Sequence, residues 1–136
     1  MPYDLSPKPS ASGFDWNTPT DYDERRKKSF HRAARKQLKA LAAYCGWPLS
    51  SYDLRSNMAG IAVSGDSTLH HEQVYISVSQ DRIGGACGIL IRSCKGRKDY
   101  SGGTNHFARL DLLDDIPLLA DQIIRCVPSL SKGGRA

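Results

Sequence analysis

The chain has 136 residues, a length typical of one domain, and 40% of them are hydrophobic, which is enough for a core without a metal or disulfide. Its formal net charge of +5 permits a nucleic acid, an acidic protein or another anionic surface as partner and requires none of them. No run approaches the roughly eighteen consecutive apolar residues of a membrane span, and the N-terminus lacks the pattern of a signal peptide. We therefore expect a cytoplasmic protein.

The first twenty residues contain four of the seven prolines and show no apolar periodicity. Such a segment buries too little apolar surface to hold one conformation, so we expect a flexible arm over residues 1–20. Phe14 and Trp16 are exceptions, because large aromatic side chains can fasten an arm to its own domain or to a partner. A single domain is predicted over residues 21–128, followed by a frayed tail over residues 129–136.

A long helix is the first regular element predicted. Thr18 or Thr20 provides its N-cap, and Gly46 followed by Pro48 ends it. Acidic residues in the first turn suit the positive end of the helix dipole. At about 100° per residue, one face of this helix is apolar and the opposite face is basic. The apolar face consists of Phe30, Ala34, Leu38, Leu41 and Cys45, with Ala33, Ala42 and Tyr44 at its margins.

Four strands are predicted in the middle of the chain, at residues 58–64, 69–79, 88–94 and 106–113. A Gly-Asp-Ser turn at residues 65–67 separates the first two. Strict alternation within 69–79 predicts that one set of side chains faces the core and the other set faces away from it. The core set is Val74, Ile76 and Val78, and the outward set is His71, Gln73, Tyr75 and Ser77.

A second helix closes the domain. Asp114 or Asp115 caps it. Pro117 occupies its first turn, where a missing N–H costs little, and Pro128 ends it. Its buried row is predicted to be Ile116, Leu119, Ala120, Ile123 and Val127. The element order is therefore α-β-β-β-β-α. Because both helices have one apolar face and the strand connections are short, we expect an α+β fold: a four-stranded, mainly antiparallel sheet with the N- and C-terminal helices on one face.

The polar face of the first helix is strongly basic. Eight of the fifteen residues from 25 to 39 are Lys or Arg, and none is acidic. Like charges four residues apart, such as Arg32 and Lys36, destabilise a free helix by about 0.2–0.5 kcal/mol per pair, so the stripe costs about 1 kcal/mol unless an anion faces it. The residues predicted to bind an anionic partner here are Lys28, Arg32, Arg35, Lys36 and Lys39. Intramolecular acids that could face them instead are Asp111, Asp114, Asp115 and Asp121.

A second basic segment connects the third and fourth predicted strands. At residues 95–105 this hairpin loop exceeds the usual length of about two to five residues. Its glycines allow positive φ, so its backbone N–H groups can form a nest for an anion, and its aromatic residue can stack on a nucleic-acid base. A plain solvent-exposed loop is the other interpretation. The loop residues predicted to bind a partner are Lys95, Arg97, Lys98 and Tyr100.

Histidine and cysteine do not show a catalytic or metal-binding spacing. The four cysteines include no C-x-x-C pair, so we predict neither a metal site nor another cofactor. Only the fold could gather a scattered set such as Cys87, Cys94 and His106. Pairing of His106 with Asp99 or Cys94 across the loop is the arrangement that would suit a general base or an activated nucleophile.

These features favour a small non-enzymatic binding protein that holds an anionic partner through the basic helix face and the basic loop. We slightly favour nucleic acid, bound through its phosphates without sequence readout, over an acidic protein surface. The alternative is a regulator or inhibitor that docks on an enzyme or nucleoprotein complex, by analogy of size and charge with the anti-defence and anti-CRISPR proteins of mobile genetic elements. An enzyme centred on His106 is the third hypothesis. The two sheet edges also make a homodimer compatible with the fold.

Overall fold

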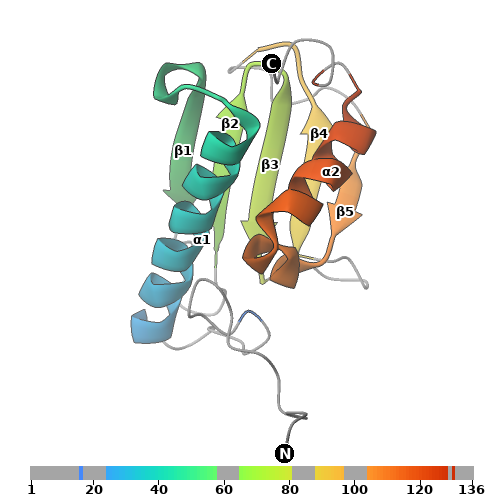
Figure 1. Cartoon of the computed structure of the whole chain (residues 1–136). Helices are drawn as coiled ribbons and strands as arrows, with labels where there is room; N and C mark the ends of the chain where they lie inside the picture. The colour runs from blue at the N-terminus through green and yellow to red at the C-terminus, as the bar shows by residue number, and fades with distance from the viewer. Residues whose placement is uncertain are drawn as a thin grey trace, which may run out of the picture.

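A computed structural model of the chain describes residues 16, 24–57, 65–80, 88–96, 104–128 and 130. Within these residues, two helices lie on one face of a five-stranded antiparallel sheet (Figure 1). The α+β fold with both helices on one side is confirmed, whereas the predicted number of four strands is wrong. The helices are α1 (Glu24–Cys45) and α2 (Ile116–Cys126), with short 3-10 helices η1 (Leu49–Ser51) and η2 (Leu110–Asp114). The strands are β1 (Tyr52–Asn57), β2 (Asp66–His71), β3 (Val74–Ser79), β4 (Ile89–Ser93) and β5 (His106–Ala108).

The strands follow one another across the sheet in the order β1-β2-β3-β4-β5, and every neighbouring pair is antiparallel. The sequence did not predict β1, whose residues YDLRSN have little apolar alternation. The single strand predicted at 69–79 is two strands, β2 and β3, joined by a tight turn at Glu72 and Gln73. This turn contains no Gly, Asn or Pro, which are the usual signals of a hairpin. The predicted strand at 58–64 lies outside the described residues.

The hairpin between β2 and β3 changes which side chains share a face of the sheet. Val74, Ile76 and Val78 are fully buried beneath the helices, as predicted. His71 was predicted to face outward, but it lies on the helix side, where its ring stacks on Trp47 with a centroid separation of 4.4 Å. The outward strand faces carry Tyr75, whose ring is approached by Arg92 at 4.5 Å and by His70 at 5.0 Å. Asp66 and Ser67, which were predicted to lie in a turn, are instead the first residues of β2.

Helix α1 ends where the sequence predicted. Gly46 has a φ of 79°, which glycine adopts without the strain that a Cβ would cause. The Gly46 N–H donates to the Ala43 carbonyl at 3.1 Å, and the Trp47 N–H donates to the Ala42 carbonyl at 2.8 Å. This pair of bonds is a Schellman motif, which satisfies carbonyls that the end of a helix otherwise leaves unpaired. The turn also directs Trp47 back over His71.

Helix α2 begins at the second of the two aspartates that were predicted as its cap. The Asp115 carboxylate accepts a hydrogen bond from the Leu118 N–H at 3.3 Å. Asp114 instead accepts a 2.8 Å hydrogen bond from the indole N–H of Trp16, whose ring is buried and meets Phe30 edge-on at 6.0 Å. Between the helices, the buried Gln37 amide donates to the Leu113 carbonyl. Polar contacts therefore fix both helices to the segment that precedes α2.

Trp16 is the residue of the predicted arm that the structure describes, and Leu130 is the corresponding residue of the predicted tail. Both belong to the core, with 4% and 3% of their surface exposed. The proposed N-terminal boundary of the domain at residue 21 lies outside the described residues. Both boundaries, at 21 and at 128, remain predictions.

Candidate functional site

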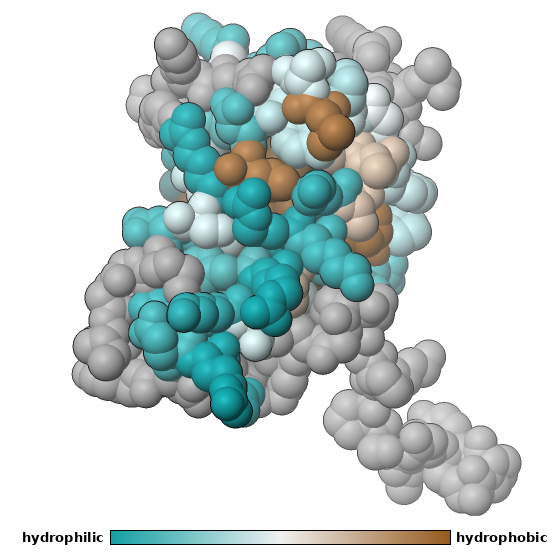
Figure 2. All heavy atoms as spheres, turned by 90° about the vertical axis from the view of Figure 1, so that its left-hand side faces the viewer, coloured by the Kyte–Doolittle hydropathy of each residue, from teal (hydrophilic) through white to brown (hydrophobic). Residues whose placement is uncertain are grey.

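The buried side of α1 determines where its charged side chains point. Phe30, Leu38 and Leu41 have no exposed surface, and α1 packs on β1, β2 and α2, so the opposite side of the helix faces solvent. The residues on this solvent side, which we call the α1 basic face, are the exposed Lys28, Arg32, Lys36 and Lys39 and the partly buried Arg35. Figure 2 shows hydrophilic side chains gathered across this side of the molecule.

Two of the three remaining cations of α1 differ from one another. Arg25 is exposed and lies seven residues before Arg32, on the same side of the helix, so it extends the basic face toward the N-terminus. The helical period could have predicted this from the sequence. Lys27 lies on the core side instead, with only 2% of its surface exposed. It is therefore not part of the face that a partner would meet.

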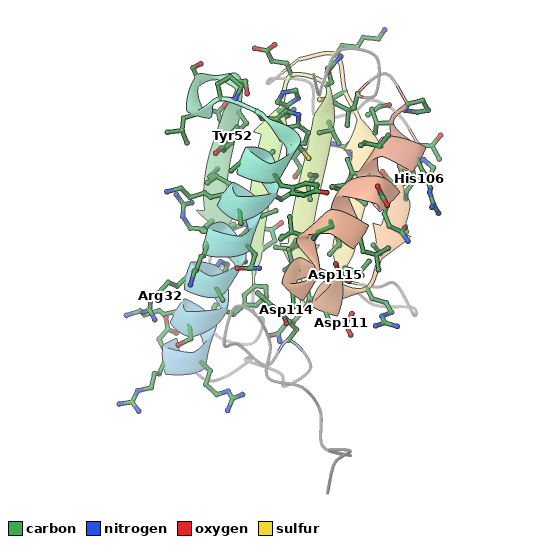
Figure 3. All side chains as sticks on the ribbon, in the orientation of Figure 1. Arg32, Tyr52, His106, Asp111, Asp114 and Asp115 are labelled. Carbon is green, nitrogen blue, oxygen red and sulfur yellow. The ribbon has the colours of Figure 1, made fainter. Side chains whose placement is uncertain are left out.

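Of the four acids that were candidates for neutralising this face, three are engaged elsewhere, and the fourth, Asp121, is exposed on α2. Asp111 forms a two-pronged salt bridge with Arg109, with an N–O distance of 2.9 Å. Asp114 accepts from Trp16, and Asp115 caps α2. In Figure 3, Arg32 points away from the body of the domain, whereas these three aspartates lie near the start of α2. None of the five cations of the basic face forms a salt bridge with a residue that the structure describes.

A buried polar chain meets the flank of the basic face. His31 Nδ1 lies 3.0 Å from the Ser67 hydroxyl on β2, and that hydroxyl lies 3.2 Å from the Ser56 hydroxyl on β1. His31 is 4% exposed and Ser67 is fully buried, whereas Ser56 is exposed. We call these three residues the polar seam. The sequence did not predict the seam, because it depends on β1 and on the register that places Ser56 opposite Ser67.

The predicted loop site is only partly described. Arg97, Lys98 and Tyr100 lie outside the described residues. Lys95 is exposed and directly follows Cys94, whose N–H donates to the Gln73 carbonyl at 3.0 Å where β4 ends. Because β4 lies beyond β3 on the part of the sheet that α2 covers, Lys95 does not lie on the α1 basic face.

The structure separates the two described groups that could have formed a catalytic pair. His106 lies on β5 opposite Ile91, at the edge of the sheet remote from α1 (Figure 3). Cys94 is three residues beyond Ile91, which is about 10 Å along an extended strand, so Cys94 and His106 are not adjacent. The Cys94 thiol donates to the His71 carbonyl at 3.2 Å. Asp99 and Cys87 lie outside the described residues. Within the described ranges, no three His, Cys, Asp or Glu side chains gather to hold a metal ion.

Cys126, in the last turn of α2, has a thiol of shifted acidity. Desolvation by burial raises the pKa of the Cys126 thiol above its ordinary value, because the thiolate loses hydration there. A raised pKa makes a thiol a weaker nucleophile at neutral pH. This residue therefore adds nothing to the catalytic hypothesis, and it lies on the other helix from the basic face.

Comparison with protein-family models, curated proteins and solved structures found no match for this chain. No helix within the described residues is both long and apolar enough to cross a membrane.

Proposed function

We propose that the protein binds nucleic acid through its backbone phosphates, with the α1 basic face as the main contact. The observation that supports this proposal is a single exposed face with five cations, while Asp111, Asp114 and Asp115 are engaged elsewhere. Phosphates would turn the repulsion along α1 into attraction and would release condensed counterions.

The composition of the face favours binding without sequence readout. Arg and Lys contact phosphates, whereas Asn and Gln are the residues that read adenine in the major groove. Gln37 is the candidate within the basic stretch, but it is buried and donates to the Leu113 carbonyl. The proposed ligand is therefore a generic strand or duplex, and the affinity depends on salt rather than on base sequence.

The direct test replaces the central cations by acids in one variant: Arg32→Glu, Arg35→Glu, Lys36→Glu and Lys39→Glu. We expect wild-type protein to bind a fluorescein-labelled oligonucleotide in anisotropy titrations, and the variant to show no binding at about 50 mM salt. The matched control keeps every charge and exchanges Arg for Lys and Lys for Arg at the same four positions. The control should keep most of the affinity, and retention of binding by the acidic variant would refute the proposal.

A protein partner is the second candidate, and two exposed apolar side chains favour it. Tyr44, at the end of α1, is 48% exposed, and Leu49, in η1, is 74% exposed. Exposed aromatic and aliphatic side chains resemble the apolar residues at the centre of a protein interface. This regulator or inhibitor hypothesis predicts a stoichiometric protein complex that survives nuclease treatment and is lost in Leu49→Ser. Salt-dependent nucleic-acid binding that Leu49→Ser leaves unchanged would argue against it.

A further inference from the structure

The polar seam connects the interior of the domain to the surface between α1 and β1. Its two inner members, His31 and Ser67, are nearly inaccessible to solvent, and Ser56 forms its exposed end. A serine hydroxyl has one hydrogen to donate, so the direction of the chain depends on His31. When Nδ1 of His31 bears a hydrogen, it donates to Ser67, Ser67 donates to Ser56, and the Ser56 hydrogen points outward. An anion at the mouth of the seam selects this direction.

Two cations of the basic face flank the seam. Lys28 precedes His31 by three residues and Arg35 follows it by four, so all three share one row of α1. On the sheet side, the pairing of β1 with β2 places Tyr52, Leu54 and Ser56 of β1 toward the helix. The acidic residues of β1 and β2, Asp53 and Asp66, alternate with these inward positions and therefore lie on the opposite face. The mouth of the seam thus combines two positive charges with one outward hydroxyl and no adjacent carboxylate from these strands.

We propose that Ser56 donates a hydrogen bond to a backbone phosphate of the bound nucleic acid, held between Lys28 and Arg35. The inference rests on the proposed function and makes it more specific, because it assigns one phosphate to the α1–β1 boundary. The Ser56 hydroxyl is held by the buried Ser67, which is itself held by His31, so it loses little freedom when it binds. It also carries no charge, so its contact with phosphate releases no counterion.

This difference in charge gives the test a distinct signature. In anisotropy titrations with the labelled oligonucleotide at several salt concentrations, we expect Ser56→Ala to weaken binding about fivefold at every concentration. The slope of log affinity against log salt should not change. Ser56→Thr, which keeps the hydroxyl, should restore the affinity. Lys28→Ala should instead reduce the slope by about one, since one phosphate contact made by a cation is lost.

The control is Ser93→Ala, on β4, which also faces the helix layer but lies two strands from β2. If Ser56→Ala binds as tightly as Ser93→Ala and wild type while the acidic α1 variant does not bind, Ser56 has no role and only this inference is overturned. A changed salt slope in Ser56→Ala would also overturn it, since that result assigns the effect to a disturbed cation. If wild-type protein binds no oligonucleotide, the proposed function fails as well. Thermal melting of each variant confirms that the compared proteins are folded.

Discussion

Single side chains link segments that are far apart in this sequence. Trp16 and Asp114 are separated by 98 positions, yet the indole N–H donates to the carboxylate at 2.8 Å. The Trp16 carbonyl also accepts from the Gln80 amide at 3.0 Å. The indole ring is buried against Phe30 of α1, so one residue contacts the helix layer, the end of the sheet and the start of α2.

Replacing this indole should therefore cost much of the stability of the domain. We expect Trp16→Ala to lower the free energy of unfolding by about 3–5 kcal/mol, the usual range for a buried Trp or Phe truncated to Ala. Asp114→Ala removes only the hydrogen-bond acceptor and should cost about 1 kcal/mol. Urea titrations followed by circular dichroism measure both values. A Trp16→Ala variant as stable as wild type would show that the residue is not part of the core.

At the scale of the element, α1 combines a well-formed apolar face with a polar face that repels itself. The apolar face packs on the sheet and holds the helix in place despite the like-charge pairs. Arg32 and Lys39 lie four and three residues from Lys36, so Lys36 takes part in two unfavourable pairs. We therefore expect the positive charge of Lys36 to lower the stability of the free protein while it strengthens the binding of nucleic acid.

Lys36→Glu should make the free protein more stable and its complex with nucleic acid weaker. Two repulsive pairs become attractive, which we expect to raise the free energy of unfolding by about 0.5–1 kcal/mol at low salt. Lys36→Gln, which only removes the charge, should give about half of that gain. Urea titrations at low and high salt check the sign and its screening. A destabilised Lys36→Glu variant would mean that Lys36 is already paired favourably in the free protein.

The elements differ in how well the sequence predicts them, for physical reasons. Helix α1 has an apolar period over six turns and a Gly-Trp-Pro end, so its buried row and its Gly46 terminus are predicted correctly. Strand β1 is held by its pairing with β2, while half of its residues are exposed. Its sequence therefore resembles a loop. The β2–β3 turn lacks the residues that usually mark a hairpin, so the prediction joined both strands and placed His71 on the wrong face.

The parts of the candidate site also differ in how well the sequence predicts them. The α1 basic face follows from helical periodicity alone, because one helix supplies all of its members. The polar seam needs three elements in one register, since His31, Ser67 and Ser56 come from α1, β2 and β1. No local sequence pattern predicts that these three side chains come into contact. Among the aspartates, Asp114 is engaged by the distant Trp16, whereas Asp111 and Asp115 bond to residues two and three positions away.

At the scale of the whole molecule, the two-layer fold places the α1 basic face apart from the aspartates near the start of α2. Helix α1 covers β1 and β2, and its basic face looks out beside the β1 edge of the described sheet (Figures 1 and 2). Helix α2 covers β4, and the aspartates that precede it are used within the domain. Within the described residues, positive charge is therefore concentrated along α1, and a basic patch of this kind favours phosphate binding.

The central claim is that affinity for nucleic acid comes from this one surface rather than from net charge. The most direct measurement compares the salt dependence of oligonucleotide binding for wild type, Arg32→Glu and Arg125→Glu. Both substitutions change the net charge by the same amount, and both residues are exposed, but Arg125 lies in the last turn of α2. We predict that Arg32→Glu lowers the magnitude of the log–log slope by about one or more, while Arg125→Glu leaves it at the wild-type value. Equal slopes for the two variants would contradict the account.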